Sequence, residues 1–487
     1  MILTDKDTNL TMLVDFYELT MANGYFEHKM QDKIACFDLF FRRVPDDGGF
    51  AIMAGLEQLI DYLEKLSFTT ADINYLRNKG IFSEGFLHYL ENFEFSCDVY
   101  AISEGTPIFP GEPIVTVKGP IIQAQFIETI ALLYINHQSL IATKANRVVR
   151  AANGKPVIEM GSRRAQGSDG AVLGARAAYI GGTSGSSCTI ADSLYGVPAL
   201  GTMAHSWVQS FDTEYEAFKK YAQLYPNNCV FLVDTYDTLK SGIPNAIKIF
   251  TEIIVPNGYA PGAIRIDSGD AAYLSKEARK MLDAAGLTKT KIVVSNSLDE
   301  YTIKDLLIQK APIDSFGVGE RLITSKTEPV FGGVYKLVAT EVAGVITPKI
   351  KISNNPEKVT TPGFKQVYRL FDKTNNKAIA DVITLFDEEI NDNEPYVIFD
   401  PDHTWKRKKL TDFYAVKLLQ PVFEKGTLVY SKPPIEEIRE YSNTQVDKLW
   451  EESLRFKKPH KYYVDLSQDL WDLKHGLLRE YSKKTLR

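Results

Sequence analysis

Six short apolar runs in the middle of the chain alternate with stretches of helical periodicity. The runs are PVIEMG, PALGTMA, CVFLVD, AIRID, KIVVS and DSFGVG, and they begin at residues 156, 198, 229, 263, 291 and 314. Such alternation is typical of βα units, in which each strand is followed by a helix that returns the chain to the same end of the sheet. We therefore expect an α/β fold built on a parallel sheet.

The pattern changes on either side of this region. Residues 1–125 combine a polar helical start with β-like runs, IACFDLFFR from Ile34 and IFPGEPIVTVKG from Ile108, and predict an N-terminal α+β domain. Residues 126–345 contain the alternating runs and are expected to form the α/β domain. In residues 346–487, β-like hairpins are followed by Glu- and Lys-rich helices, which predicts a separate C-terminal region.

The charge balance limits the classes of partner. Lys and Arg number 56 against 62 Asp and Glu among the 487 residues, and the longest basic run is the short KRKK of residues 406–409. A protein that binds nucleic acid would carry a basic patch or stripe, so this composition argues against that class. We expect instead a small, anionic metabolite as the partner.

Cysteine usage and the apolar segments indicate a soluble protein. The four cysteines, at positions 36, 97, 188 and 229, lie far apart and form no CxxC pair, which argues against a disulfide framework and a structural zinc site. The N-terminal MILTDKDTNLTML lacks the pattern of a signal peptide, and the apolar segment 126–135 is too short to span a bilayer. We therefore expect no membrane association and a cytoplasmic location.

Polar clusters follow the apolar runs. In chain order they read GSRR, HS, DTYD, DSGD, SNS and GVGER. The carboxyl ends of parallel strands meet on one face of a barrel or an open sheet, and ligands bind there. A single polar, Gly-rich loop after a strand is common, but six in succession predict one site built from six strand ends.

Two of these clusters allow both a functional and a structural interpretation. Asp267 and Asp270 place two carboxylates behind a strand, where they suit Mg²⁺ or a developing positive charge, yet the same residues suit a helix N-cap. Gly317 and Gly319 could bring backbone N–H groups close to a phosphate with Arg321 behind them, but a GxG sequence is also common in tight turns.

Arginine and hydroxyl side chains add a possible anion site. Arg163 and Arg164 follow a predicted strand, where adjacent guanidinium groups are costly unless they meet a carboxylate or a phosphate. The loop GGTSGSS of residues 181–187 offers hydroxyl groups and a flexible backbone, although loops of this composition usually have no ligand.

His205, in GTMAHSWVQSF, has three possible roles. A solitary histidine most often caps a helix or fills a core. It is a poor candidate for a metal ligand, because the other histidines, at positions 28, 88, 137, 403, 460 and 475, show no ligand spacing with it. A neutral imidazole held by a carboxylate can also accept a phosphoryl group, and Asp234 or Asp237 could provide that carboxylate.

The ordered motifs resemble those of the nicotinate phosphoribosyltransferase family. They are MGSRRAQGSDGAVLGARAAYIGGTSGSSCTIA, GTMAHSW, VDTYDT, IRIDSGD, VVSNSLDE and FGVGERL, and the resemblance covers almost the whole chain. It implies the irregular α/β barrel of type II phosphoribosyltransferases, with an N-terminal α+β domain, a C-terminal extension and a homodimeric assembly.

The resemblance also implies a reaction. Nicotinate and 5-phosphoribosyl 1-diphosphate (PRPP) are joined to give nicotinate mononucleotide and pyrophosphate, the first step of NAD salvage from nicotinate. This pentosyl transfer is coupled to ATP hydrolysis through a phosphohistidine, which falls on His205 by motif position, and Mg²⁺ is the expected cofactor.

The resemblance to the family implies roles for individual residues. Nicotinate is expected to meet Tyr17, Arg163, Ser184, Thr202 and Arg265, and the phosphates of PRPP to meet Arg164, Asp270, Ser295, Asn296, Gly317 and Gly319. Asp234 and Asp267 are expected to act with His205, and Asp267 and Asp270 to hold Mg²⁺. Tyr17, in VDFYELTMANGY, is expected to stack on nicotinate across the dimer interface, although it also fits one face of an amphipathic helix.

The choice between the acid and the amide is predicted from one position. Related nicotinamide enzymes carry an aspartate in the loop that matches GGTSG, whereas this chain has Ser184. The Ser184 hydroxyl can donate a hydrogen bond to the carboxylate of nicotinate, and Arg163 or Arg164 can balance the negative charge of that carboxylate. The alternatives are a nicotinamide or quinolinate transferase, a non-catalytic metabolite-binding protein, and a phosphate-binding barrel isomerase or aldolase, which would need a Lys or Glu base at a strand end.

Overall fold

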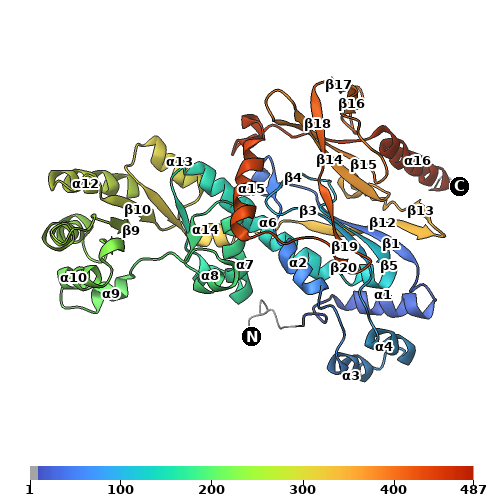
Figure 1. Ribbon diagram of the computed structural model, residues 1–487, viewed down its shortest axis with the longest axis horizontal. Coiled ribbons are helices and arrows are strands. Elements are labelled where there is room, and N and C mark those ends of the chain that lie inside the picture. The colour runs from blue at the N-terminus through green and yellow to red at the C-terminus, as the bar shows by residue number, and fades with distance from the viewer. Residues whose placement is uncertain (1–8, 486–487) are drawn as a thin grey trace. The chain divides into compact units, whose positions relative to one another are not determined.

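The computed structural model describes residues 9–485, which form two compact units (Figure 1). The first unit combines the chain up to residue 140 with the chain from residue 330 onward, and the second unit comprises residues 141–329. The long helix α6 (Glu128–Ala151) passes from the first unit into the second. The boundaries at residues 125 and 345 follow changes in sequence pattern and stay a prediction.

A parallel sheet forms the core of the second unit. Its strands are β6 (Val157–Glu159), β7 (Gly185–Ser186), β8 (Val230–Leu232), β9 (Ala263–Ile266), β10 (Lys291–Ser295) and β11 (Ser315–Val318). They run in the order β7-β6-β11-β10-β9-β8, and every neighbouring pair is parallel. The predicted α/β fold with a parallel sheet is therefore confirmed.

One of the six predicted strands does not form. Within the run PALGTMA only Ala199 pairs, through an isolated parallel bridge to Ser186, and residues 200–204 have no regular secondary structure. Pro198 has no backbone donor and Gly201 has no side chain to pack, so this segment is a poor strand former. His205 nevertheless begins helix α9 (His205–Gln209) directly after the segment, as expected.

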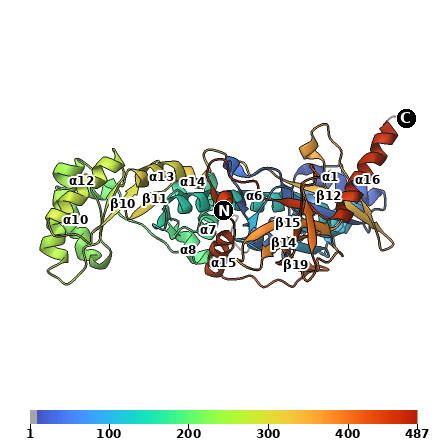
Figure 2. The same ribbon diagram turned by 90° about the horizontal axis from the view of Figure 1, so that it is seen from above.

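Helices surround the parallel sheet. Besides α6 and α9 they are α7 (Gly167–Ile180), α8 (Thr189–Tyr195), α10 (Glu214–Leu224), α11 (Ile243–Ile249), α12 (Ala271–Ala284), α13 (Glu300–Ile308) and α14 (Glu320–Ile323). Helices α7, α8 and α14 gather near one end of the unit, and α10, α11 and α12 near the other (Figures 1 and 2). Thr213, Asp270 and Asp299 cap α10, α12 and α13 by accepting hydrogen bonds from first-turn N–H groups.

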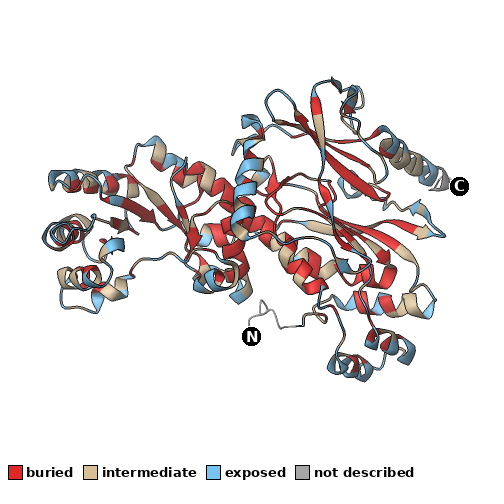
Figure 3. Ribbon diagram, viewed as in Figure 1, coloured by how far each residue is buried: buried red, intermediate tan, exposed pale blue. Residues whose placement is uncertain are grey.

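Large apolar side chains hold this sheet to its helices. Phe231 of β8 is fully buried, and its ring lies 4.8 Å from that of Phe218 on α10 and 5.0 Å from that of Phe250. Ile264 of β9 and Phe316 of β11 are equally buried, and the strands appear as mostly buried segments in Figure 3. Burial of each such side chain stabilises the fold by about 1.5–3 kcal/mol, which keeps the carboxyl ends of the strands in fixed positions.

The sheets of the first unit are antiparallel except for one parallel pair. A seven-stranded sheet runs β13 (Val345–Pro348), β12 (Gly333–Val342), β1 (Ile34–Phe41), β5 (Val115–Pro120), β3 (Asp98–Ile102), β19 (Leu419–Glu424), β20 (Thr427–Leu428). A four-stranded sheet runs β18 (Phe413–Lys417), β14 (Lys365–Asp372), β15 (Ala378–Leu385), β21 (Val464–Leu466), and β15 and β21 are the parallel pair. Two short pairs join β2 (Ala51–Ile52) to β4 (Pro107–Ile108) and β16 (Tyr396–Phe399) to β17 (Arg407–Leu410).

The helices of the first unit flank these sheets. They are α1 (Phe16–Glu27), α2 (Leu56–Leu63), α3 (Thr70–Asn78), α4 (Glu84–Glu91), α5 (Ile121–Gln125), α15 (Ile435–Asp447) and α16 (Gln468–Thr485). Among residues 9–485, none of the helices reaches the length and hydrophobicity that crossing a membrane requires.

Strands and charges from both ends of the sequence meet in the first unit. Strand β1 lies between β5 and β12, so that Ile34 pairs with Pro120 on one side and with Glu341 on the other. A buried ion pair of 2.8 Å joins Lys365 of β14 to Asp38 of β1. The N-terminal and C-terminal parts of the chain therefore share one core in this unit.

Candidate active site

A cavity of about 460 Å³ opens at the carboxyl ends of the parallel strands in the second unit. Segment 199–205 forms one wall, and Met160, Arg163, Ser187, Thr189, Leu232, Arg265 and Asp267 complete the lining. These residues lie in or directly after strands β6, β7, β8 and β9. Four strand ends therefore contribute to one concave site, fewer than the six that the polar clusters predict.

Arg265 of β9 is the centre of the polar network in the cavity. Its Nε donates to Ser295 Oγ (2.9 Å), its Nη1 to Thr202 Oγ1 (2.9 Å) and its Nη2 to Asp267 Oδ1 (2.8 Å). Ser295 Oγ also donates to the same Asp267 oxygen. The structure thus brings four of the predicted site residues into one network. These hydrogen bonds fix the plane of the Arg265 guanidinium group, and the Arg265 side chain is only 14% exposed.

His205 lies at the rim of the same cavity with its side chain 41% exposed. Its Nε2 is 3.9 Å from Asp267 Oδ2, and its Nδ1 is 3.1 Å from Thr235 Oγ1. The sequence offered Asp234 or Asp237 as the partner of the imidazole, whereas the structure places Asp267 and Thr235 beside it. Thr235 was missed, although it lies within the VDTYDT motif next to Asp234.

Asp234 and Asp237 have other contacts. Asp234 Oδ2 accepts hydrogen bonds from Asp267 N (3.0 Å) and Ser268 Oγ (2.6 Å), so this carboxylate supports the turn after β9. Asp234 Oδ1 is buried and has no hydrogen-bond partner among the described residues. Asp237 accepts from the N–H groups of residues 239 and 240 and caps the π-helical turn Thr238–Gly242. The catalytic role of Asp234 stays a prediction.

Asp270 forms the N-cap of helix α12. Its Oδ1 accepts a hydrogen bond from Tyr273 N (3.0 Å), and it does not line the cavity. Within the described chain, no three His, Cys, Asp or Glu side chains lie close enough together to hold a metal ion. The geometry therefore accounts for Asp270 as a cap, and its contact with Mg²⁺ or PRPP stays a prediction.

The predicted phosphate loops follow β10 and β11. A Cβ on Gly317 would lie 2.6 Å from Met160 Sδ, and one on Gly319 would lie 3.1 Å from Met160 O, so close packing against the β6 end accounts for both glycines. Asn296 is exposed and has a left-handed φ of 81°. Asn296, Gly317 and Gly319 are not part of the cavity lining, and their contact with phosphates stays a prediction.

The two arginines after β6 are placed differently. Both lie on the exposed 3₁₀ turn Ser162–Arg164, but only Arg163 lines the cavity. Arg164 lies close enough to Glu320 to lower the pKa of that carboxyl, after the larger effect of a hydrogen bond from Lys326. The cavity therefore favours Arg163 over Arg164 as a contact for a bound anion.

Ser184 is not part of the cavity wall. It precedes β7, and its backbone N–H donates to Val157 O (2.8 Å). Ser187, further along the same loop, and Thr189, the first residue of α8, both line the cavity. The expected donation from Ser184 to nicotinate stays a prediction.

Glu159 is a buried carboxyl that the sequence analysis missed. It is the last residue of β6, and it accepts hydrogen bonds from Gly161 N and from Ser186 Oγ (2.5 Å). Burial raises the pKa of Glu159, although these two hydrogen bonds oppose the shift. Glu159 thus joins the turn that carries Arg163 to the loop that carries Ser187. Its signal is a charged residue within an otherwise apolar strand.

Tyr17 lies on α1 of the first unit and is 42% exposed. Partial burial, followed by the charge of Glu128, raises the pKa of its hydroxyl. The neighbouring Glu18 is fully buried, and burial raises its pKa to about 7. The predicted stacking of Tyr17 on nicotinate stays a prediction.

Comparisons with known proteins agree on one family. Sequence models for the nicotinate phosphoribosyltransferase (NAPRTase) N-terminal domain, the NAPRTase family and the NAPRTase C-terminal domain match residues 12–136, 156–378 and 364–474. The nicotinate phosphoribosyltransferase of Bacillus subtilis is 46% identical over 479 residues, which cover 98% of this chain and 97% of that protein. The human protein of the same name is 31% identical, with 96% of each chain covered.

Solved structures support the same assignment. The crystal structure of human nicotinic acid phosphoribosyltransferase superimposes with a TM-score of 0.84 at 29% identity, covering 95% of this chain and 99% of that one. A nicotinate-nucleotide pyrophosphorylase from Pyrococcus furiosus shares the fold, with a TM-score of 0.69 at 24% identity. Together with the strand-end cavity, these similarities show that the chain belongs to the nicotinate phosphoribosyltransferase family.

Proposed function

We propose that this enzyme joins nicotinate to PRPP to form nicotinate mononucleotide and pyrophosphate, and that ATP hydrolysis drives the reaction through a phosphohistidine at His205. The observation that carries the proposal is the arrangement of Arg265, Asp267 and His205 around one cavity. The product would enter NAD salvage from nicotinate.

Nicotinate would bind through its carboxylate. Arg265 has a fixed guanidinium plane at the cavity wall, and Arg163 adds a second positive charge. A guanidinium group binds a carboxylate through two parallel hydrogen bonds, which sets the orientation of the pyridine ring. A volume of about 460 Å³ also lies within the usual range for small-molecule sites.

Asp267 is suited to the sugar end of the reaction. Transfer to the pyridine nitrogen breaks the bond between the anomeric carbon and pyrophosphate, and positive charge develops on the ribosyl ring as this bond breaks. A carboxylate next to the ring stabilises that charge. Asp267 Oδ2 makes no hydrogen bond in the described part of the chain, so this oxygen is available at the cavity.

Mg²⁺ fits the residues around this carboxylate. In enzymes that act on phosphates, Mg²⁺ is commonly bound by one or two carboxylates together with phosphate oxygens of the substrate, and Asp267 provides such a ligand. When bound, the ion would neutralise charge on the departing pyrophosphate. The protein itself would orient nicotinate and hold the carboxylate beside the sugar.

His205 would carry the phosphoryl group on Nε2. In the neutral tautomer that donates Nδ1–H to Thr235 Oγ1, Nε2 carries the free electron pair and can act as the nucleophile. The Nε2–P bond forms as the bond from the γ-phosphorus to the bridging oxygen of ATP breaks, and ADP leaves. Later attack by water releases inorganic phosphate and restores the imidazole. The transient negative charge beside Asp267 would favour binding of Mg²⁺ with PRPP.

Replacement of His205 by alanine tests the coupling. We expect His205→Ala to abolish stimulation by ATP while slow synthesis of nicotinate mononucleotide continues, because displacement from PRPP requires no phosphoryl donor. The measurement is the initial rate with and without ATP. His403→Ala, which removes an exposed histidine from the first unit, is the matched control and should retain full stimulation. Undiminished stimulation in His205→Ala would contradict the role of His205.

Substrate preference tests the proposed reaction itself. We expect kcat/KM for nicotinate to exceed that for nicotinamide by roughly ten- to a hundredfold, since loss of a charge-assisted contact costs about 1.5–3 kcal/mol. Steady-state kinetics with nicotinate, nicotinamide and quinolinate, each with PRPP, provide the comparison. A preference for nicotinamide or quinolinate would replace the proposed function with that of a sibling transferase.

We also propose that two copies of the chain assemble so that Tyr17 of the partner subunit covers the nicotinate ring. The exposure of Tyr17 at 42% is consistent with an aromatic side chain that has a further contact to make.

A further inference from the structure

Two strand-end loops are tied together behind the candidate site. One loop follows β10 and contains Ser295, Asn296 and Ser297, and the other follows β11 and leads into the short helix α14. Ser295 receives a hydrogen bond from Arg265 and donates one to Asp267. The sequence analysis predicts that residues of both loops meet the phosphates of PRPP, the substrate of the proposed function, so the relative position of the loops matters for binding that substrate.

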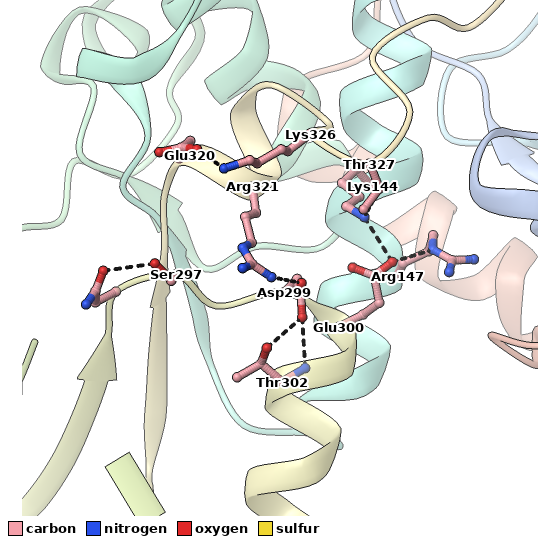
Figure 4. A network of polar contacts seen from close by, with 11 residues as sticks. Lys144, Arg147, Ser297, Asp299, Glu300, Thr302, Glu320, Arg321, Lys326 and Thr327 are labelled. Carbon is pink, nitrogen blue, oxygen red and sulfur yellow. Dashed lines mark hydrogen bonds and ion pairs between the residues drawn. The ribbon is translucent and has the colours of Figure 1, made fainter. Parts of the chain in front are cut away.

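An ion pair joins the two loops. Arg321 Nη1 on α14 donates to Asp299 Oδ2, at the end of the β10 loop (Figure 4). The Asp299 side chain is only 7% exposed, whereas that of Arg321 is 38% exposed. Burial tends to raise the pKa of Asp299, but hydrogen bonds from Thr302 and Arg321 outweigh it and keep that pKa below its usual value. Asp299 therefore stays charged, and the pair persists at neutral pH.

The other oxygen of Asp299 has a separate task. Asp299 Oδ1 accepts from Thr302 N (2.8 Å) and Thr302 Oγ1 (2.9 Å) and so caps helix α13. The Asp299 carboxylate thus binds the N-terminus of α13 through Oδ1 and Arg321 of α14 through Oδ2. Because an asparagine can still accept the capping bond, the two tasks can be separated by substitution.

A buried cluster of charged side chains holds the start of α13 to α6. Glu300, the first residue of α13, is fully buried and accepts from Lys144 Nζ (3.0 Å) and Arg147 Nε (2.9 Å) on α6 (Figure 4). Lys144 Nζ also donates to Thr327 Oγ1 (3.0 Å), beyond α14. The segment from Arg321 to Thr327 is thus tied at both of its ends to the start of α13.

The β10 loop has a backbone that requires such support. Asn296 and Ser297 both have left-handed φ values, 81° and 52°, and both are exposed. Asparagine tolerates this region, but serine does so at a cost, and such conformations persist only where the surrounding structure fixes them. The loop is fixed on one side by the contacts of Ser295 and on the other by Asp299.

We propose that Asp299 and Arg321 are positioning residues that hold the β10 and β11 loops in register for the phosphates of PRPP. The inference rests on the proposed function of these loops. Arg321 acts through Asp299 and does not itself touch the substrate. Loss of the pair therefore weakens binding of PRPP more than binding of nicotinate, because none of the predicted nicotinate contacts lies on these two loops.

The decisive variant is Asp299→Asn, which retains the cap on α13 and removes the charge that binds Arg321. We expect KM for PRPP to rise about tenfold while KM for nicotinate changes less than twofold, in line with the range over which positioning residues alter coupling between sites. Lys326→Met removes an exposed cation from the ion pair with Glu320 on the same segment and is the matched control, with both KM values unchanged. Thermal unfolding midpoints check that each variant is folded.

Arg321→Met and the double variant identify the mode of action. If the two residues act as a pair, Arg321→Met raises KM for PRPP as much as Asp299→Asn does. The double variant Asp299→Asn/Arg321→Met then has a KM for PRPP no higher than that of either single variant. If Arg321 binds phosphate directly, Asp299→Asn leaves KM for PRPP unchanged or lowers it, and Arg321→Met alone raises it, which overturns the proposal. Unmodified enzyme that forms no nicotinate mononucleotide would refute the proposed function instead.

Discussion

Replacement of Arg265 by methionine should lower kcat/KM for nicotinate by roughly a hundred- to several thousandfold, because removal of one partner from a largely desolvated charge network costs about 3–5 kcal/mol. Methionine has a similar length but cannot bind a carboxylate, and it leaves Asp267 without the guanidinium that neutralises it at 2.8 Å. The same change should reduce the preference for nicotinate over nicotinamide, since the charge that recognises the acid is gone.

Three variants measured side by side test the role of Arg265. Arg265→Lys keeps the charge but lacks the planar guanidinium group. Its kcat/KM for nicotinate should therefore lie between the values of the wild type and Arg265→Met. Arg163→Met removes the other cavity arginine, which is exposed on a 3₁₀ turn, and should have a smaller effect. A larger loss in Arg163→Met than in Arg265→Met would assign the carboxylate contact to Arg163.

The second large effect concerns stability. Arg369→Met is expected to lower the free energy of unfolding of the first unit by about 3–5 kcal/mol, because it leaves the buried Asp381 carboxylate unpaired. Arg369 donates to both oxygens of Asp381 (2.8 and 2.6 Å) and to Pro107 O (2.8 Å). Its guanidinium also lies 5.3 Å from the ring of Phe109 and 5.9 Å from that of Tyr462.

Urea unfolding followed by tryptophan fluorescence is the appropriate measurement, since three of the four tryptophans, at positions 405, 450 and 471, belong to the first unit. The double variant Arg369→Met/Asp381→Leu should recover much of the loss, because no buried charge remains. Burial, followed by the charge of Asp381, raises the pKa of the neighbouring Glu112 and so favours its neutral form. A double variant as unstable as Arg369→Met would show that packing, rather than charge, dominates.

The parallel sheet was predictable because each strand has a local signature. The runs at Cys229, Ala263 and Lys291 are apolar for several residues and end in polar clusters, and each contains a strand of the observed sheet. Strand β7 has only the two residues Gly185 and Ser186, too few for any periodicity to appear. Residues 198–204 have an apolar composition like that of a strand, but Pro198 lacks a backbone donor and Gly201 lacks a side chain, which weakens pairing.

The members of the polar network were predictable, but their pairing was not. Arg265, Asp267, Thr202 and Ser295 were all expected near the strand ends, and one hydrogen-bond network joins them. Which side chain faces His205 depends on the register between strands and on the exact turn after β8, and neither is encoded locally. Thr235 and Glu159 were missed for this reason, since both act through contacts to residues about 30 positions away.

The placement of β12 beside β1 has a consequence for biosynthesis. Ile34 pairs with Glu341, so at a translation rate of 5–20 residues per second the ribosome delivers the partner strand roughly 15–60 s after β1. Over that interval the apolar β1 has one edge without its hydrogen-bonding neighbour, which is a template for intermolecular aggregation. Residues 141–329 are contiguous and emerge complete within the same interval, so the second unit can fold on the nascent chain while β1 of the first unit still lacks β12.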